Sequence, residues 1–259
     1  MNERMPISRI GGVELDRSVS EAERKLRIEL AAAFRIAQHL GWNIDTLNHI
    51  TLRIPDTDLF LMNPLGLGWD EITASSLATA AYDGKIVSHS EVRLAPAGFN
   101  FHSGILKARP DINCVIDTHE DAGAVISATT DPLLVFDQGG CRLYDEVGSH
   151  AFEGLANQED EVPRILRDLG HRHTLIMRNH GLLTVGRTIG EAFVVMFRLE
   201  QSIEAQLMAQ ATGRELLVPE EEICDKAAVD RDRTNDVSND DTWQAWMRVA
   251  DQIDSSYQK

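Results

Sequence analysis

The sequence has few cysteines, more acidic than basic residues and no long apolar run. Its three cysteines, Cys114, Cys141 and Cys224, are widely spaced and odd in number, which argues against a disulfide framework or a thiolate zinc site. The 25 basic residues face 41 acidic ones, and the net charge of −16 disfavours binding to nucleic acids or anionic membranes, because both require a basic surface. No stretch approaches the roughly 20 apolar residues of a membrane-spanning helix.

A secretion signal is also missing. The first ten residues, MNERMPISRI, contain no long apolar segment, so no signal peptide is expected. Together with cysteines that resemble ordinary cytosolic thiols, this predicts a cytoplasmic protein. What the chain does contain is 43% hydrophobic and 25% charged residues over 259 positions, enough for one large domain or two small ones with a packed core.

The first half of the chain alternates predicted helices and short strands. A helix is expected over 20–40, because Ser20 and Glu23 form a capping box and apolar residues follow at helical spacing. Strands are expected in NHITLRIP (48–55) and DLFLMNP (58–64), and Asp83-Gly84 is typical of a hairpin turn. The remaining expected elements are a helix over 101–108, a strand in CVIDTHE (114–120), a helix in DAGAVISA (121–128) and an apolar strand in LLVF (133–136).

The second half continues this alternation. We expect a helix over 160–169, strands in TLIMR (174–178) and LLTVG (182–186), and a long helix from a Thr188/Glu191 capping box to about residue 211. Residues 218–241 are acidic and polar, which predicts an exposed connector before a short amphipathic helix, WQAWMRVADQI. We therefore divide the chain into an N-terminal extension (1–19), a domain (20–215), and an acidic connector with a C-terminal helix (216–259). The interleaved elements predict an α/β fold with a largely antiparallel sheet covered by helices.

The segment CVIDTHE passes from apolar to ionisable residues within a few positions. In an extended segment, Asp117 and His119 point to the same face. Such a pair can begin a metal site, form a catalytic acid–base pair or simply end a strand in water. His180 lies on the turn Asn179-His180-Gly181 between two apolar strands, where a rigid backbone can aim it as a third ligand. Two histidines and one carboxylate suit zinc, iron(II) and manganese.

Other histidines carry weaker signals. His102, in GFNFHSGI, is placed either to face the cleft or to cap a helix, and His150, in GSHAFEG, lies at an apolar–polar boundary where it could contact a substrate. His49 and His89 stay undecided, and no signal marks His39, His171 and His173. The spacing of titratable groups alone does not predict a function.

Several ordered segments resemble the class II aldolase/adducin family over roughly residues 20–215. They are NHITLRIP, LFLMNPLGLGWDEITASSL, FHSGILKARPDINCVIDTHEDAGAVIS, GSHAFEG and IMRNHGLLTVGRTIGEAFVVMFRLEQSIEAQLMA. Such a succession is specific, unlike a lone short pattern. The resemblance implies a three-layer α/β/α domain with a mostly antiparallel central sheet, and a homotetramer with active sites near subunit boundaries. Cytoskeletal adducins carry the same domain without known enzyme activity, so fold alone does not fix function.

The resemblance also implies site residues. In the family's enzymes a divalent metal, usually zinc, is held by a His-x-His pair and by the histidine of an Asn-His-Gly turn; these positions fall on Asp117, His119 and His180. The acid/base glutamate and phosphate-binding serines of sugar-phosphate aldolases fall on residues 96–99, which read Pro-Ala-Gly-Phe and offer neither a carboxyl nor a hydroxyl group. A further phosphate-contacting loop reads Pro64-Leu65-Gly66. A typical sugar-phosphate aldolase is therefore not expected.

The chemistry that fits these residues is that of a metal-dependent lyase, of retro-aldol or decarboxylase type, acting on a small unphosphorylated oxygenated or keto acid. We expect zinc, with iron(II) or manganese as alternatives, held by Asp117, His119 and His180. The expected catalytic residues are His102, His150 and Asp117. An aromatic residue near the C-terminus, such as Tyr257, could reach a neighbouring subunit's site.

Two alternatives of other kinds stay open. A site of two histidines and one carboxylate is also typical of non-haem iron(II) oxygenases. Loss of one imidazole and of the acid/base glutamate would equally fit a non-catalytic, adducin-like scaffold.

Overall fold

The computed structural model describes residues 19–43, 46–88, 92–155 and 159–259 as an α/β fold around a seven-stranded sheet. The strands are β1 (His49–Ile54), β2 (Leu59–Met62), β3 (Ala78–Ala81), β4 (Cys114–Thr118), β5 (Val147–His150), β6 (Thr174–Met177) and β7 (Gly181–Gly186). Their order is β3-β2-β1-β4-β7-β6-β5, and every neighbouring pair is antiparallel except β5 and β6. The predicted mostly antiparallel sheet is confirmed.

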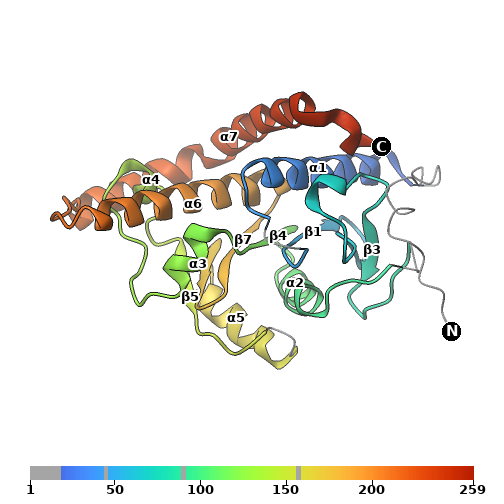
Figure 1. The fold of residues 1–259 in the computed structure, drawn as a ribbon, viewed down its shortest axis with the longest axis horizontal. Coiled ribbons are helices and arrows are strands. Elements are labelled where there is room, and N and C mark those ends of the chain that lie inside the picture. Colours follow the sequence, from blue (N-terminus) through green and yellow to red (C-terminus); the bar gives the residue numbers. More distant parts are fainter. Residues whose placement is uncertain (1–18, 44–45, 89–91, 156–158) are drawn as a thin grey trace.

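Helices cover both faces of the sheet (Figure 1). One layer contains α1 (Glu21–His39), α6 (Ile189–Ala211) and α7 (Glu221–Asp254), and the other contains α2 (Pro96–Ala108) and α5 (Val162–Leu169). Shorter elements join them: α3 (Asp121–Ser127), α4 (Gln138–Cys141) and the 3₁₀ turns η2 (Trp69–Glu71), η3 (Glu159–Glu161) and η4 (Ser255–Gln258). The predicted three-layer α/β/α architecture is therefore confirmed.

The alternation of side chains along β4 links the two core layers to the site. Cys114 and Ile116 are buried in the core that α1 and α6 cover, whereas Val115 packs into the core beneath α2 and α5. Because side chains alternate along a strand, Asp117 faces the same side as Val115. Asp117 thus lies at the end of the core that α2 and α5 cover, and its side chain is almost fully buried.

Local signals in the sequence set several boundaries. The Ser20 hydroxyl accepts from the Glu23 amide at 3.1 Å, and the Thr188 hydroxyl accepts from the Glu191 amide at 3.0 Å, so both predicted N-caps are confirmed. The predicted hairpin at Asp83-Gly84 is also confirmed, since Ala80 bridges to Ile86 in antiparallel fashion. The predicted N-terminal extension (1–19) lies outside the described residues except for its last residue, as does His89.

Four elements of the fold differ from expectation. Helix α2 begins at Pro96 rather than at residue 101, because proline at the first helical position needs no amide partner. Residues 133–136 are not a strand; they run as irregular chain into α4. Strands β3 and β5 were not predicted, because their sequences, ATAA and VGSH, lack an apolar alternation.

The predicted exposed connector over 218–241 is wrong. Helix α7 runs without a break for 34 residues and packs beside α6 and α1 (Figure 1). Trp243 is 3% exposed and its ring lies 5.4 Å from that of Phe193 on α6. Acidic side chains dominate because only a few positions, such as Cys224 and Asn239, face the core. The amphipathic helix expected at the end of the chain is the last part of α7, and the division at residue 216 stays a prediction.

The end of the described chain is fastened to the β2–β3 connection. The amides of Ala74 and Ser75 donate to the carbonyls of Tyr257 and Lys259, each at 2.8 Å. The Tyr257 side chain is fully buried and its hydroxyl donates to Asp251 at 2.6 Å. The expectation that Tyr257 reaches a neighbouring site is therefore wrong, since its own subunit encloses it. In the described ranges, no helix combines the length and apolar character needed to cross a membrane.

Candidate metal centre

Asp117, His119 and His180 converge as the sequence predicts. Each offers one ligand atom, and these atoms lie within 4.8 Å of one another. Nε2 of His119 lies 3.3 Å from one carboxylate oxygen of Asp117, and Nε2 of His180 lies 3.7 Å from the other. The carboxylate thus stands between two imidazoles that come from distant parts of the sequence.

The strand pairing and the turn hold this geometry. β4 and β7 pair so that Asp117 lies opposite Leu183, which brings the start of β7 to the end of β4. In the turn, Asn179 has a positive φ of 55° and its amide donates to Ser127 at 3.0 Å. A Cβ on Gly181 would lie 2.2 Å from the carbonyl oxygen of Thr118, so only glycine allows this close approach. The turn histidine is therefore fixed from both sides.

These residues fit a divalent cation. Oδ1 of Asp117 and Nε2 of His119 are buried and have no hydrogen-bond partner within the described part of the chain. Buried polar atoms without partners are rare and call for a missing partner. Ligand atoms bound at tetrahedral zinc lie about 3.3 Å apart, given bonds of about 2.0–2.1 Å, which is close to the separations across this cluster. A cation would satisfy the atoms that the protein leaves unpaired.

Electrostatics favour an ionised carboxylate at the centre. Burial by itself would raise the pKa of Asp117, but the adjacent imidazoles of His119 and His180 outweigh it and hold that pKa well below its usual range. For His119, burial opposes protonation, yet the charge of Asp117 raises its pKa overall. The site therefore keeps a negative charge ready for a cation.

His102 lies beside the cluster without joining it. It occupies the middle of α2, so it does not cap that helix. Its Nδ1 lies 3.0 Å from the Thr51 hydroxyl, and its buried Nε2 has no partner among the described residues. Complete burial lowers the pKa of His102 to about 3, despite the nearby charge of Asp117. A neutral imidazole therefore adjoins the candidate centre.

His49 is a residue of this site that the sequence pattern left undecided. It starts β1 and pairs directly with Asp117 across the two strands. Its ring lies 6.1 Å from that of His102, edge to face, and its side chain is nearly fully buried. Only the strand register, which short-range patterns do not encode, brings it to the site.

His150 is held by a separate set of groups. Its Nδ1 lies 2.7 Å from Asp168 on α5, and its Nε2 lies 3.4 Å from Glu161. It is buried at the end of β5, and both ring nitrogens are thus occupied by carboxylates. The structure does not bring His150 into the group of Asp117, His119 and His180, and its predicted catalytic role remains a prediction.

Two buried carboxylates lie in the layer behind the cluster. Glu120 follows His119 directly, and Glu200 comes from α6. Burial, reinforced by the negative charge of Glu120, raises the pKa of Glu200 to about 8. Burial likewise raises the pKa of Glu120. Glu200 is therefore largely protonated at neutral pH in the folded chain.

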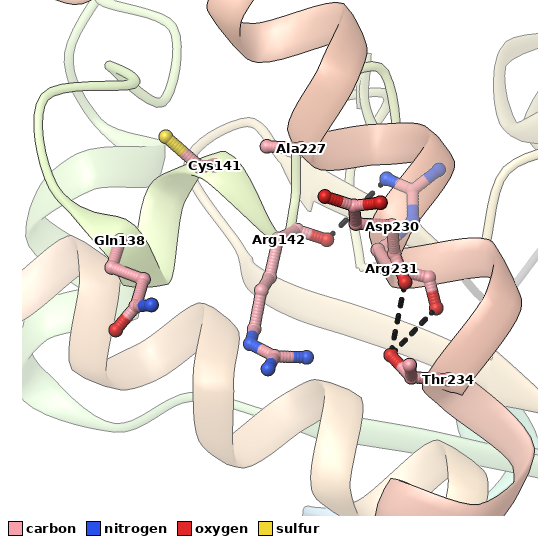
Figure 2. Close-up of a pocket in the computed structure, with 7 residues that line it drawn as sticks. All are labelled: Gln138, Cys141, Arg142, Ala227, Asp230, Arg231 and Thr234. Atoms are coloured by element: carbon pink, nitrogen blue, oxygen red, sulfur yellow. Dashed lines mark hydrogen bonds between the residues drawn. The ribbon is translucent and has the colours of Figure 1, made fainter.

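A cavity between α4 and α7 contains none of the predicted site residues. Figure 2 shows its lining, with side chains that include Arg142, Arg231 and Thr234, and it has a volume of about 300 Å³. Arg231 donates to the carbonyl oxygens of Arg142 and Tyr144, which ties α7 to the segment after α4. These contacts hold the two helices together, and the candidate metal ligands lie elsewhere, at the end of β4.

Known proteins share this fold and much of the sequence. Residues 28–207 match the family described as the class II aldolase and adducin N-terminal domain. A class 2 aldolase-type protein of Pseudomonas aeruginosa is 36% identical over 251 residues, covering 95% of this chain and 96% of its own length. The crystal structure of an aldolase II superfamily protein from Pseudomonas syringae has 34% identity and a TM-score of 0.89, covering 93% of this chain and 98% of that one.

Two further relatives carry different functional names. An L-fuculose 1-phosphate aldolase from Glaciozyma antarctica PI12 has 25% identity and a TM-score of 0.82, covering 98% of this chain and all of that one. Rat alpha-adducin is 39% identical over 204 residues, which are 76% of this chain but 28% of that protein. With a family match over most of its length and relatives above 30% identity, this chain belongs to the class II aldolase and adducin N-terminal domain family.

Proposed function

We propose that the chain is a divalent-metal-dependent lyase that breaks a carbon–carbon bond in a small, unphosphorylated oxygenated or keto acid. The observation that carries this proposal is the convergence of Asp117, His119 and His180 within 4.8 Å of one another. Class II aldolases use a divalent metal, and the family match extends this expectation to the chain. Zinc is the metal that the ligand types and spacing favour.

The residues have distinct roles in this proposal. Asp117, His119 and His180 would hold the cation, which when bound supplies a Lewis acid for a substrate carbonyl. Asp117 brings one negative charge and acts as a ligand rather than a base. His119 and His180 keep side-chain exposures of 25% and 18%, so the centre stays open to a small molecule on their side. His102, with an unpartnered Nε2, is the predicted catalytic residue that the geometry supports best.

The residues at the start of α2 and in the loop after β2 support an unphosphorylated substrate. Residues 96–99 form the first turn of α2, and neither they nor the loop Pro64-Leu65-Gly66 offer a hydroxyl or basic side chain. Phosphate sites usually combine backbone amides with charged or hydroxyl side chains at close range, and these segments supply no such side chains. The fuculose-phosphate aldolase relative therefore supports the reaction class rather than its substrate.

Metal analysis and product detection test the proposal together. Protein purified without chelators should contain close to one zinc, manganese or iron ion per chain, lost with a chelator and regained on reloading. The reloaded protein should cleave or decarboxylate members of a panel of unphosphorylated hydroxy and keto acids, detected by mass spectrometry. Protein that stays metal-free after incubation with all three ions would contradict every metal-dependent reading.

The same metal-free and metal-loaded protein samples distinguish two alternative functions. The similarity to rat alpha-adducin favours a binding module without catalysis, which predicts no metal and no turnover. The two-histidine, one-carboxylate set also suits an iron(II) oxygenase, which predicts oxygen consumption by the iron-loaded protein with an aromatic or keto acid. Anaerobic turnover by the zinc-loaded protein would exclude the oxygenase.

The proposal extends to assembly and location. We propose a homotetramer, as expected from the family resemblance, and a cytoplasmic location, in keeping with free thiols at Cys114, Cys141 and Cys224. Light scattering coupled to gel filtration measures the first, and a mass other than four chains of 28.8 kDa would contradict it. Cell fractionation measures the second.

A further inference from the structure

The His49 ring occupies the space that a side chain at position 98 would need. Gly98 lies in the first turn of α2, and a Cβ built on it would lie 2.1 Å from Cδ2 of the His49 ring and 2.6 Å from its Cγ. Real Cβ atoms essentially never approach another atom so closely. The imidazole of His49 therefore stands where any side chain at position 98 would begin.

The His49 ring is fixed in this space by its neighbours. Its Nδ1 lies 3.4 Å from Oδ1 of Asn63. The amide nitrogen of Asn63 donates to the carbonyl of Asn48 at 3.4 Å, which sets the orientation of the Asn63 amide. Nδ1 of His49 is therefore the nitrogen that carries the proton, and Nε2 is left as an acceptor. Within the described residues, Nε2 has no hydrogen-bond partner.

The ring also faces the candidate centre. His49 and Asp117 are direct cross-strand partners, and such side chains lie on the same face of a sheet with Cβ atoms about 5 Å apart. The His49 ring also lies 6.1 Å from the ring of His102, edge to face, and His102 adjoins the candidate centre. An acceptor without a partner thus lies beside the three ligands.

We propose that His49 is a substrate-contacting residue, whose Nε2 accepts a hydrogen bond from a hydroxyl group of a molecule held at Asp117, His119 and His180, and that glycine at position 98 is required for this. The inference rests on the proposed function and narrows its substrate class to compounds with a hydroxyl next to the chelating oxygens. A hydroxy keto acid or a dihydroxy ketone meets this condition, because a hydroxyl remains beside the two chelating oxygens, and a simple keto acid does not.

Two chelators that differ by one hydroxyl group test the contact. Glycolohydroxamate and acetohydroxamate bind zinc through the same two oxygens, but only the former carries an adjacent hydroxyl. We expect zinc-loaded protein to prefer glycolohydroxamate by about five- to tenfold, the range for one neutral hydrogen bond. His49→Ala should remove the preference and leave the zinc dissociation constant within about threefold. His49→Phe keeps a ring in the space and should remove the preference as well, even if the alanine variant folds poorly.

A double-mutant cycle tests the requirement for glycine. Gly98→Ala should lower the melting temperature and the hydroxyl preference, because the new methyl group displaces the His49 ring. In a His49→Ala background, the same substitution should be neutral or stabilising, since alanine favours the helix once the ring is gone. Equal effects of Gly98→Ala in both backgrounds would overturn the steric relationship.

The outcomes separate this inference from the proposed function. Zinc binding with an undiminished hydroxyl preference in His49→Phe, or with no preference in the unmodified chain, overturns the role of His49 alone. Failure of the unmodified chain to bind zinc, manganese and iron(II) overturns both proposals. Loss of the preference with zinc retained supports both.

Discussion

Nε2 of His119 lies 3.3 Å from Oδ2 of Asp117, its neighbour two residues back in the chain. The two groups do not form a hydrogen bond of good geometry, since Nε2 of His119 remains without a partner among the described residues. They are placed as two ligands of one ion would be. The carboxylate at position 117, where the family resemblance implies an imidazole, therefore places a ligand atom beside His119 and adds a negative charge.

Asp117→Asn tests that charge. Asparagine keeps the shape and one oxygen but removes the negative charge, so zinc affinity should fall by about tenfold or more. Competition against a chromophoric chelator measures the change. Asp121→Asn is the matched control, because Asp121 is an exposed residue at the start of α3. Equal zinc affinity of Asp117→Asn and the unmodified chain would remove Asp117 from the centre.

Glu200→Gln tests whether the Glu200 carboxyl group stays protonated in the folded chain. The folded pKa of about 8 exceeds the ordinary value of 4.5, so between these values the unfolded chain releases a proton that the folded chain keeps. The free energy of unfolding should therefore fall as pH rises through this window, by up to about 1.4 kcal/mol per pH unit. Glutamine cannot ionise, so the variant should be more stable than the unmodified chain at pH 8, by about 2–4 kcal/mol, the lower value allowing for solvent screening of Glu200, and similar at pH 4.5.

Urea unfolding at a series of pH values measures this difference. Glu222→Gln serves as the control, because Glu222 is an exposed carboxylate in the first turn of α7. Parallel pH profiles for Glu200→Gln and the unmodified chain would show that Glu200 is ionised at neutral pH.

His150→Gln is expected to act on stability rather than on the metal. It removes the group that lies between Asp168 and Glu161, and the buried Glu161 carboxylate would lose its partner, at a cost of about 2 kcal/mol. Zinc affinity should stay within about twofold. Calorimetric unfolding together with zinc titration measures the two effects, and loss of turnover at full stability and unchanged zinc affinity would favour the catalytic role expected from the sequence.

Trp243→Ala tests whether α7 is an integral part of the domain. The indole packs on Phe193, and a Cβ on Gly190 would lie 2.6 Å from its Cγ, so the tryptophan fills a tight space against α6. Its removal should cost about 3–5 kcal/mol, as for other large buried side chains. Gln244→Ala, at the exposed neighbouring position, should change stability by less than about 0.5 kcal/mol. A similarly small effect of both substitutions on stability would support the prediction of an exposed connector.

The sequence predicts those parts of the fold whose signal is local. The helices that begin at Ser20 and Thr188 have capping residues followed by apolar residues at helical spacing, and both are found. β4 and β7 are apolar runs with clear ends, and both are found as well. By contrast, β5 (Val147–His150) has half-exposed glycine and serine, and only its parallel neighbour β6 makes it a strand.

The failure at α7 has a physical reason. A helix that lies on the surface of two others needs few apolar positions, and aspartate, asparagine and threonine between them resemble a connector in composition. Tertiary contacts with α1 and α6 overcome that weak propensity.

Some residues of the candidate site could likewise be predicted from the sequence, and others could not. Asp117, His119 and His180 could be predicted because each lies at or just beyond the end of an apolar strand and carries a ligand-type side chain. His49 could not, because its place beside Asp117 depends on which strands pair and in which register. Gly98 carried no positive signal either, since the reason for a glycine there is a ring from another strand.

The fastening of Tyr257 and Lys259 to the amides of Ala74 and Ser75 has a consequence for how the molecule can open. These two hydrogen bonds join the last residues to the connection between β2 and β3, so this end of the chain is anchored to that connection as well as to the helices beside it. A chain shortened by the residues after α7 would leave both amides without these acceptors, and α7 would be held by its contacts with α6 and α1. We therefore expect the shortened chain to begin unfolding at the end of α7.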